Sequence, residues 1–150
     1  MAVLFAVAPA AADGDAASRE IPALPFAIAG SGCTQEDIPA LEIILTVNAW
    51  NKADPPPRPY LRIEVAGIVL GAPSTLALSP LRRDPSQRIV ARAELYGYEG
   101  GGVWLSGTLR LGPVSPGHTV EGAYSFCQDS DRCAEGKFKA LWRPGAARCG

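Results

Sequence analysis

The sequence has few of the residues that usually carry catalysis or bind metals. Its single histidine, His118, has no nucleophile elbow or other local signature of a Ser-His-Asp enzyme around it. None of the four cysteines is spaced C-x-x-C, so with one histidine they do not indicate a zinc site. The glycine run 100–102 is not followed by the Lys-Ser/Thr of a phosphate-binding loop. We therefore expect a non-catalytic protein with no metal and no cofactor.

Charge of either sign is scarce and nearly balanced. The chain has 14 Lys and Arg against 15 Asp and Glu, which gives a formal net charge of -1, and charged residues make up 19% of it. Without a global positive field, the chain is not expected to bind nucleic acid or an anionic membrane. No segment reaches the roughly 18 uninterrupted apolar residues of a membrane span. The sequence thus predicts one monomeric globular domain with no membrane span.

The N-terminal residues 1–12 carry no charge and end in three alanines before the polar Asp13. This pattern resembles the end of a secretory signal peptide with an A-x-A cleavage site, although no Lys or Arg precedes the apolar residues. An alanine-rich helix or strand of the fold is the alternative. We expect residues 1–12 to be a signal-peptide remnant, 13–23 a flexible segment and 24–150 the folded domain of a secreted or periplasmic protein.

Glycine and proline are abundant, with 16 and 14 residues, and they separate short segments in which apolar and polar residues alternate. Alternation with a period of two predicts strands, and frequent turn formers disfavour a helical bundle. The expected fold is an all-β antiparallel meander barrel of seven or eight strands, with a two-sheet sandwich as the alternative. The candidate strands are 26–30, 41–50, 60–66, 74–79, 89–98, 103–111, 119–127 and 133–142.

Four cysteines, an even number, suit two disulfides in an exported domain. Pairing the last two candidate strands across the loop 128–132 places Cys127 opposite Cys133, at a separation that a disulfide can bridge. Cys33 is then left for Cys149. The same register puts Glu121 opposite Lys139 on the outer face, where the two side chains can form an ion pair.

On the inner face of these strands, bulky residues alternate with glycines. The register places Tyr124 opposite Gly136 and Phe138 opposite Gly122, so that each ring covers the backbone of a residue without a side chain. Gly107, on the preceding strand, faces the same side. These three glycines are expected to be the points where the sheet curves into a barrel.

Three aromatic residues gather on the outer face of the preceding hairpin. If Gly100, Gly101 and Gly102 form a three-residue loop, Tyr98 lies opposite Trp104 and Tyr96 opposite Ser106. Leu111 is then expected to pair with Val120. Tyr96, Tyr98 and Trp104 together predict a stacking platform for a sugar or for a side chain of a partner. In the alternative interpretation, a loop covers them.

The expected function is that of an exported, non-catalytic binding module, for example an inhibitor, whose partner is an extracellular or periplasmic protein or glycan. One alternative is a carrier with an apolar barrel cavity, which Leu95, Leu109, Val120 and Phe138 would line. The other is a hydrolase that uses two converging carboxylates. Glu42, Glu64 and Glu94 lie on alternating strand faces, where solvated or ion-paired carboxylates are ordinary, so no pair stands out.

Overall fold

A computed structural model describes residues 21–34, 36–51, 54–78, 89–145 and 148–150. In these residues the fold is all-β, as predicted, and contains eight strands and no helix. The proposed signal-peptide remnant 1–12 and most of the segment 13–23 lie outside the described residues. The strands are β1 (Phe26–Cys33), β2 (Pro39–Thr46), β3 (Tyr60–Ala66), β4 (Ser74–Leu78), β5 (Val90–Tyr96), β6 (Gly102–Leu111), β7 (Val120–Cys127) and β8 (Cys133–Trp142).

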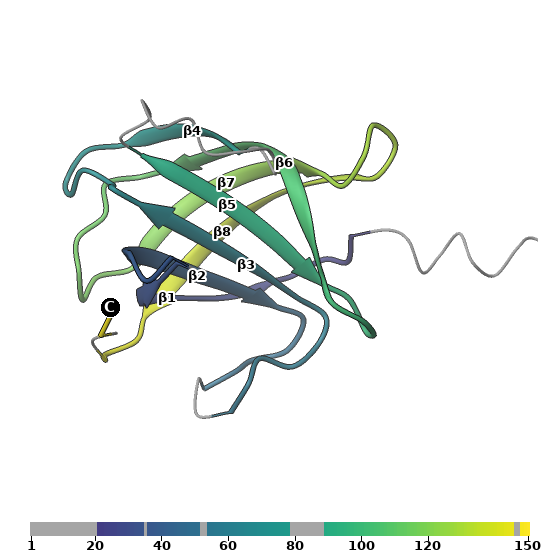
Figure 1. Ribbon diagram of the computed structural model, residues 1–150, viewed down its shortest axis with the longest axis horizontal. Helices are drawn as coiled ribbons and strands as arrows, with labels where there is room; N and C mark the ends of the chain where they lie inside the picture. Colours follow the sequence, from purple (N-terminus) through teal and green to yellow (C-terminus); the bar gives the residue numbers. More distant parts are fainter. Residues whose placement is uncertain (1–20, 35, 52–53, 79–88, 146–147) are drawn as a thin grey trace, which may run out of the picture.

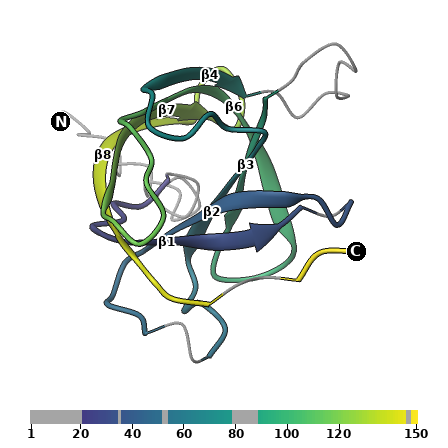
Figure 2. The same ribbon diagram turned by 90° about the vertical axis from the view of Figure 1, so that its left-hand side faces the viewer.

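Seven of the strands close into a barrel in the order β1-β2-β3-β5-β6-β7-β8, and β4 lies outside it, paired with β6 (Figure 1). Figure 2 shows the barrel from its left-hand end. The closing pair β1 and β8 is parallel, with Ile28 beside Leu141. The other neighbouring pairs of the barrel, β1–β2, β2–β3, β3–β5, β5–β6, β6–β7 and β7–β8, are antiparallel, as predicted. Because seven strands alternate in direction around the ring, the first and the last must run the same way.

β6 pairs with two different strands along one edge. Its first part, Gly102 to Leu105, pairs with β5, and its second part, Gly107 to Leu111, pairs with β4. The change of partner falls at Gly107, whose φ of +138° favours glycine. A Cβ at Gly107 would also collide with the carbonyl oxygen of Ser125. Gly107 therefore lets β6 bend where β4 replaces β5, in agreement with its predicted role.

Side chains from all seven barrel strands fill the interior. The largest fully buried ones are Phe126, Ile43, Leu45, Leu61, Ile63, Leu105 and Leu109. The four residues expected to line a ligand cavity, Leu95, Leu109, Val120 and Phe138, all belong to this packed cluster. They therefore contribute to the hydrophobic core.

The predicted register of β7 and β8 is confirmed at every pair from Val120–Ala140 to Cys127–Cys133. A Cβ at Gly136 would lie 2.6 Å from Cζ of Tyr124, and one at Gly122 would lie 2.9 Å from Cε1 of Phe138. Each ring therefore occupies the space that the glycine leaves. Both predicted disulfides, Cys127–Cys133 and Cys33–Cys149, are also present.

The predicted registers on both sides of β6 were wrong by an even number of residues. Leu95 pairs with Val103 instead of Gly107, because the β5–β6 loop spans residues 97–101 rather than three glycines. Leu111 pairs with Gly122 instead of Val120. Side chains in a strand alternate with a period of two, so slips of four and two residues leave every side chain on its predicted face.

Candidate functional site

The outer face of β2, β3, β5 and the start of β6 carries an unusual concentration of charged and aromatic side chains. Adjacent strands align these side chains in cross-strand rows. The row Glu42, Glu64 and Arg92 lies nearest the β1–β2 turn; the next row is Ile44, Arg62, Glu94 and Trp104; and the last is Thr46, Tyr60, Tyr96 and Gly102. We call this surface the charged face.

Arg62 is the centre of the charged face. Its Nη2 lies 2.7 Å from Oε1 of Glu64, and its Nε donates a 3.0 Å hydrogen bond to Oε2 of Glu42. Glu64 is only 5% exposed, although it points away from the barrel interior. Burial raises the pKa of the Glu64 carboxyl, and the Arg62 guanidinium opposes that rise. This cluster of charges is therefore largely sealed from solvent.

Glu94 and Tyr96 form a second, hydrogen-bonded pair of the charged face, in which Glu94 is buried and Tyr96 is partly buried. The Tyr96 hydroxyl donates a 2.8 Å hydrogen bond to Oε2 of Glu94, which is 9% exposed. The Glu94 side chain lies over Gly102, where a Cβ would collide with it. Burial and the bond to Glu94 raise the pKa of Tyr96 to about 12. The space above Gly102 also gives a physical reason for the observed β5–β6 register.

The end of the charged face nearest the β5–β6 loop is built from stacked rings. Tyr60 and Tyr96 stack with their ring centroids 4.6 Å apart and an interplanar angle of 14°. The guanidinium of Arg58 lies 5.6 Å from the centroid of Tyr96. The Nη1 of Arg58 also donates to the carbonyl oxygens of Gly100, at 2.5 Å, and Gly97, at 3.5 Å. Arg58 thus ties the β2–β3 loop to the β5–β6 loop.

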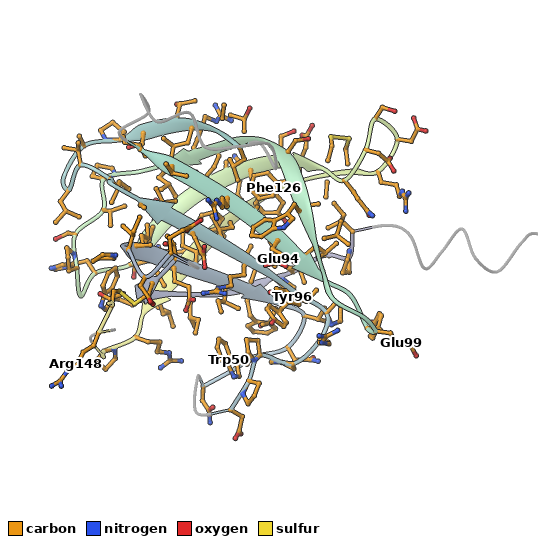
Figure 3. All side chains as sticks on the ribbon, viewed as in Figure 1. Trp50, Glu94, Tyr96, Glu99, Phe126 and Arg148 are labelled. Carbon is orange, nitrogen blue, oxygen red and sulfur yellow. A yellow bond between two sulfur atoms is a disulfide. The ribbon has the colours of Figure 1, made fainter. Side chains whose placement is uncertain are left out.

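The three predicted binding residues lie in different settings. Tyr98 is 78% exposed in the β5–β6 loop and does not pair with Trp104, which lies opposite Glu94. Tyr96 pairs with Gly102, not with Ser106, and stacks on Tyr60. Figure 3 shows Tyr96 between Glu94 and the end of the hairpin, where Glu99 lies. We call Arg58, Tyr60, Tyr96 and Tyr98 the aromatic corner.

Trp104 belongs to the charged face rather than to the aromatic corner. Its ring lies 6.0 Å from the guanidinium of Arg92, which also binds Oε1 of Glu36 at 2.9 Å. Glu36 lies in the turn between β1 and β2, so this ion pair draws the turn toward the charged face. The pKa of Glu36 is lowered, chiefly by its hydrogen bond to Arg92.

Sequence reasoning did not find Arg58 and Tyr60. The Pro-rich stretch before Tyr60 predicted only a loop, and nothing local shows that the next strand packs beside 89–98. β3 pairs with β5 because β4 leaves the barrel, and this arrangement aligns Tyr60 with Tyr96. The sequence does indicate one thing about these tyrosines: in the alternation of their strands, both occupy positions that face outward.

The described residues do not assemble an evident catalytic or metal centre. Among them no group of three or more His, Cys, Asp or Glu is placed to hold a metal ion. Glu42 and Glu64 both bind Arg62, and Glu94 accepts the Tyr96 hydroxyl, so these carboxylates are engaged in contacts within the fold. In the same part of the chain, there is no helix with the length and hydrophobicity to span a bilayer.

The chain matches no protein-family model, no curated protein and no solved structure.

Proposed function

We propose that the protein is an exported, non-catalytic module that binds another protein through the aromatic corner. The observation that carries this proposal is Tyr98, a large ring that is 78% exposed on a short loop held by Arg58. The two disulfides are consistent with an oxidising, extracellular environment, which supports export.

The aromatic corner has the properties of a preorganised anchor. Arg58 bonds two carbonyls of the loop that carries Tyr98, so little loop entropy is lost on binding. Tyrosine supplies a large amphipathic contact with few rotatable bonds, and it is enriched at the energetic centres of protein interfaces. A single projecting ring suits insertion into a pocket of a partner, as in an inhibitor.

The same geometry makes a sugar platform the weaker proposal. A sugar stacks on an open ring face, but Tyr96 already stacks on Tyr60 and has the Arg58 guanidinium nearby. Tyr98 and Trp104 are not opposed across the hairpin, so the three rings do not make one row. We therefore favour a protein over a glycan as the partner.

The test is affinity capture from the extracellular or periplasmic fraction of source cells, followed by calorimetry with the purified partner. We expect Tyr98→Ala to weaken binding by roughly 30-fold, the effect of losing one interface hot spot. Lys137→Ala, on the outer face of β8, is the matched control and should bind as the wild type does. Equal binding by Tyr98→Ala, or no captured protein, would contradict the proposal.

A second candidate function, a carrier of small apolar ligands, is favoured by a pocket at one end of the barrel. The pocket has a volume of about 360 Å³ and is lined by Leu41, Val65, Val114, Trp142 and the β3–β4 loop. Leu70 of this loop is one of its walls and is 57% exposed. Saturable binding of N-phenyl-1-naphthylamine that is lost in Leu70→Asp would support a carrier.

A further inference from the structure

A small pocket lies at the end of the charged face farthest from the aromatic corner. It has a volume of about 120 Å³ and lies between the β1–β2 turn and the outer faces of β3 and β5. Its walls combine apolar residues with charged ones: Ile38, Ala66, Val90, Glu36, Glu64 and Arg92. We call it the Glu64 pocket.

Among the described residues, none donates a hydrogen bond to one of the two carboxylate oxygens of Glu64. Oε1 is bound by Arg62 at 2.7 Å, but Oε2 is buried and has no partner within the part of the chain that the structure describes. Glu64 as a whole is 95% buried and forms part of the pocket wall. A buried carboxylate oxygen without a donor is unfavourable, so a ligand that supplies a donor at this point would be stabilised.

The charges around the pocket indicate the sign of that ligand. Four carboxylates, on Glu36, Glu42, Glu64 and Glu94, surround the guanidiniums of Arg62 and Arg92. Arg62 is shared between two of these carboxylates, and Arg92 is held by Glu36. The surroundings of Oε2 therefore favour a cation that carries N–H donors.

The walls of the pocket indicate its chemical class. Ile38, Ala66 and Val90 present apolar surface beside the carboxylates, which suits a methylene chain that ends in a charged group. A divalent metal would need more oxygen ligands than this set supplies, since the described residues hold no metal-binding group of three. The volume is sufficient for an ammonium group and part of its alkyl chain.

We propose that the Glu64 pocket binds a primary alkylammonium group, such as a lysine side chain or a small aliphatic amine, with Glu64 Oε2 as its main acceptor. The alkyl chain lies against Ile38, Ala66 and Val90, and Glu36 adds a second negative charge at the β1–β2 turn. This site goes beyond the proposed protein-binding function and does not depend on Tyr98.

The experiment is a titration of the full-length chain with n-butylammonium chloride, followed by amide chemical shifts. We expect saturable shifts at the backbone of Ile38, Ala66, Gly67 and Val90, and Glu64→Gln should weaken binding at least about tenfold. Glu121→Gln, an exposed carboxylate on β7, is the matched control and should leave the affinity unchanged. Absence of saturable shifts, or equal binding by Glu64→Gln, would overturn the proposal.

Two further ligands and a second variant test the proposal further. They separate the contribution of the ammonium charge from that of the alkyl chain, and they distinguish a lysine residue from a free amine as the ligand. Butanol has the chain without the charge and should not bind, and N-acetyl-lysine methylamide tests whether a lysine residue binds as well as a free amine. Glu36→Gln replaces a carboxylate whose side chain is 48% exposed and releases Arg92 to compete for Glu64, so it should also weaken binding. If Glu36→Gln binds butylammonium as tightly as the wild type, the proposal fails even where Glu64→Gln does not fold.

The proposal of an amine site and the proposal of protein binding at the aromatic corner can be refuted independently of each other. Tyr98→Ala should leave the butylammonium titration unchanged, because Tyr98 lies in the loop beyond β5 and the pocket is built around Glu64 and Arg92. Equally, binding of butylammonium would remain a valid result if no protein partner were captured.

Discussion

Two regions of the barrel's outer surface carry ion pairs in very different surroundings. On the charged face, Arg62 and Glu64 approach to 2.7 Å, and their side chains are 29% and 6% exposed. On β7 and β8, Glu121 and Lys139 lie 3.4 Å apart with side chains 67% and 71% exposed. Both pairs point away from the core. The outside of one barrel can therefore combine an ordinary solvated surface with a second region in which a carboxylate is almost completely buried beside its cation.

The difference arises from what lies over each region. Over the charged face, the Glu36–Arg92 pair draws in the β1–β2 turn, and Arg58 holds the β2–β3 loop against the stacked tyrosines. Over β6, β7 and β8 there is an open groove of about 590 Å³, lined by residues such as Thr108, Ser125 and Lys137. The two sites that we propose, the aromatic corner and the Glu64 pocket, lie at opposite ends of the charged face, beside the loops that cover it.

The largest expected effect is the loss of stability when a disulfide is removed. This loss should differ between the two disulfides, each of which supports one region. Cys33 is the last residue of β1, next to the turn beside the charged face, whereas Cys127–Cys133 closes the β7–β8 hairpin. In the chain-entropy model, replacing Cys33 and Cys149 with alanine costs about 5 kcal/mol, and replacing Cys127 and Cys133 about 2 kcal/mol. Urea unfolding of the two double variants measures these losses. Equal losses would show that the long bridge does not constrain the unfolded chain.

Arg62→Met is expected to reduce the free energy of unfolding by about 3 kcal/mol, because it leaves Glu64 and Glu42 without their shared cation. Lys139→Met removes the cation of the exposed pair and should cost less than about 1 kcal/mol. Chemical denaturation of both variants tests the comparison. Similar costs for the two would mean that the charges of the charged face are effectively solvated.

The stability of the β7–β8 region is expected to depend on the packing of its inner face rather than on its outer ion pair. Gly122→Val should cost about 2 kcal/mol, because the added side chain meets Phe138 and the carbonyl oxygen of Arg110. Gly101→Val is the matched control, since a Cβ there has no neighbour within 4 Å among the described residues, and it should change stability by less than about 0.5 kcal/mol. Thermal melts of both variants give the answer, and a neutral Gly122→Val would refute the packing of ring over glycine.

The smallest expected effect is a pH dependence from Glu64. Because burial raises its pKa above the ordinary value of 4.5, the folded protein holds this proton more tightly than the unfolded chain. That contribution to stability is complete below 4.5 and is lost as the pH rises through the folded pKa. The wild type should therefore lose stability relative to Glu64→Gln as the pH rises from 4.5 through the higher pKa of the folded state. A pH-independent difference would contradict this, and Glu121→Gln serves as the exposed control.

The fold class and the β7–β8 hairpin could be predicted from the sequence because their signals are local. A five-residue loop between two cysteines, and glycines opposite aromatic residues, leave one consistent register. The predicted length of the β5–β6 loop was wrong because a glycine run marks a turn but does not fix how many residues the turn contains. The prediction of which side chains share a face was still correct, since alternation determines on which side of the sheet a residue lies even where it does not determine its cross-strand partner.

The charged face could not be predicted because it depends on contacts between distant parts of the chain. Glu64 and Glu94 were expected to be ordinary solvated or ion-paired carboxylates, and although Glu64 is ion-paired with Arg62, both carboxylates are buried. Their burial requires β3 to pair with β5 across the excluded β4, and the β1–β2 turn to fold over the sheet. Alternation within a strand carries no information on either event.

The most direct test of this contrast is a pair of double-mutant cycles, Arg62→Met with Glu64→Gln and Lys139→Met with Glu121→Gln, measured by urea unfolding. We predict a coupling free energy of about 2 kcal/mol for the buried pair and below about 0.5 kcal/mol for the exposed pair. Equal coupling in the two cycles would contradict the view that one side of the barrel's outer surface is a sealed, preorganised layer.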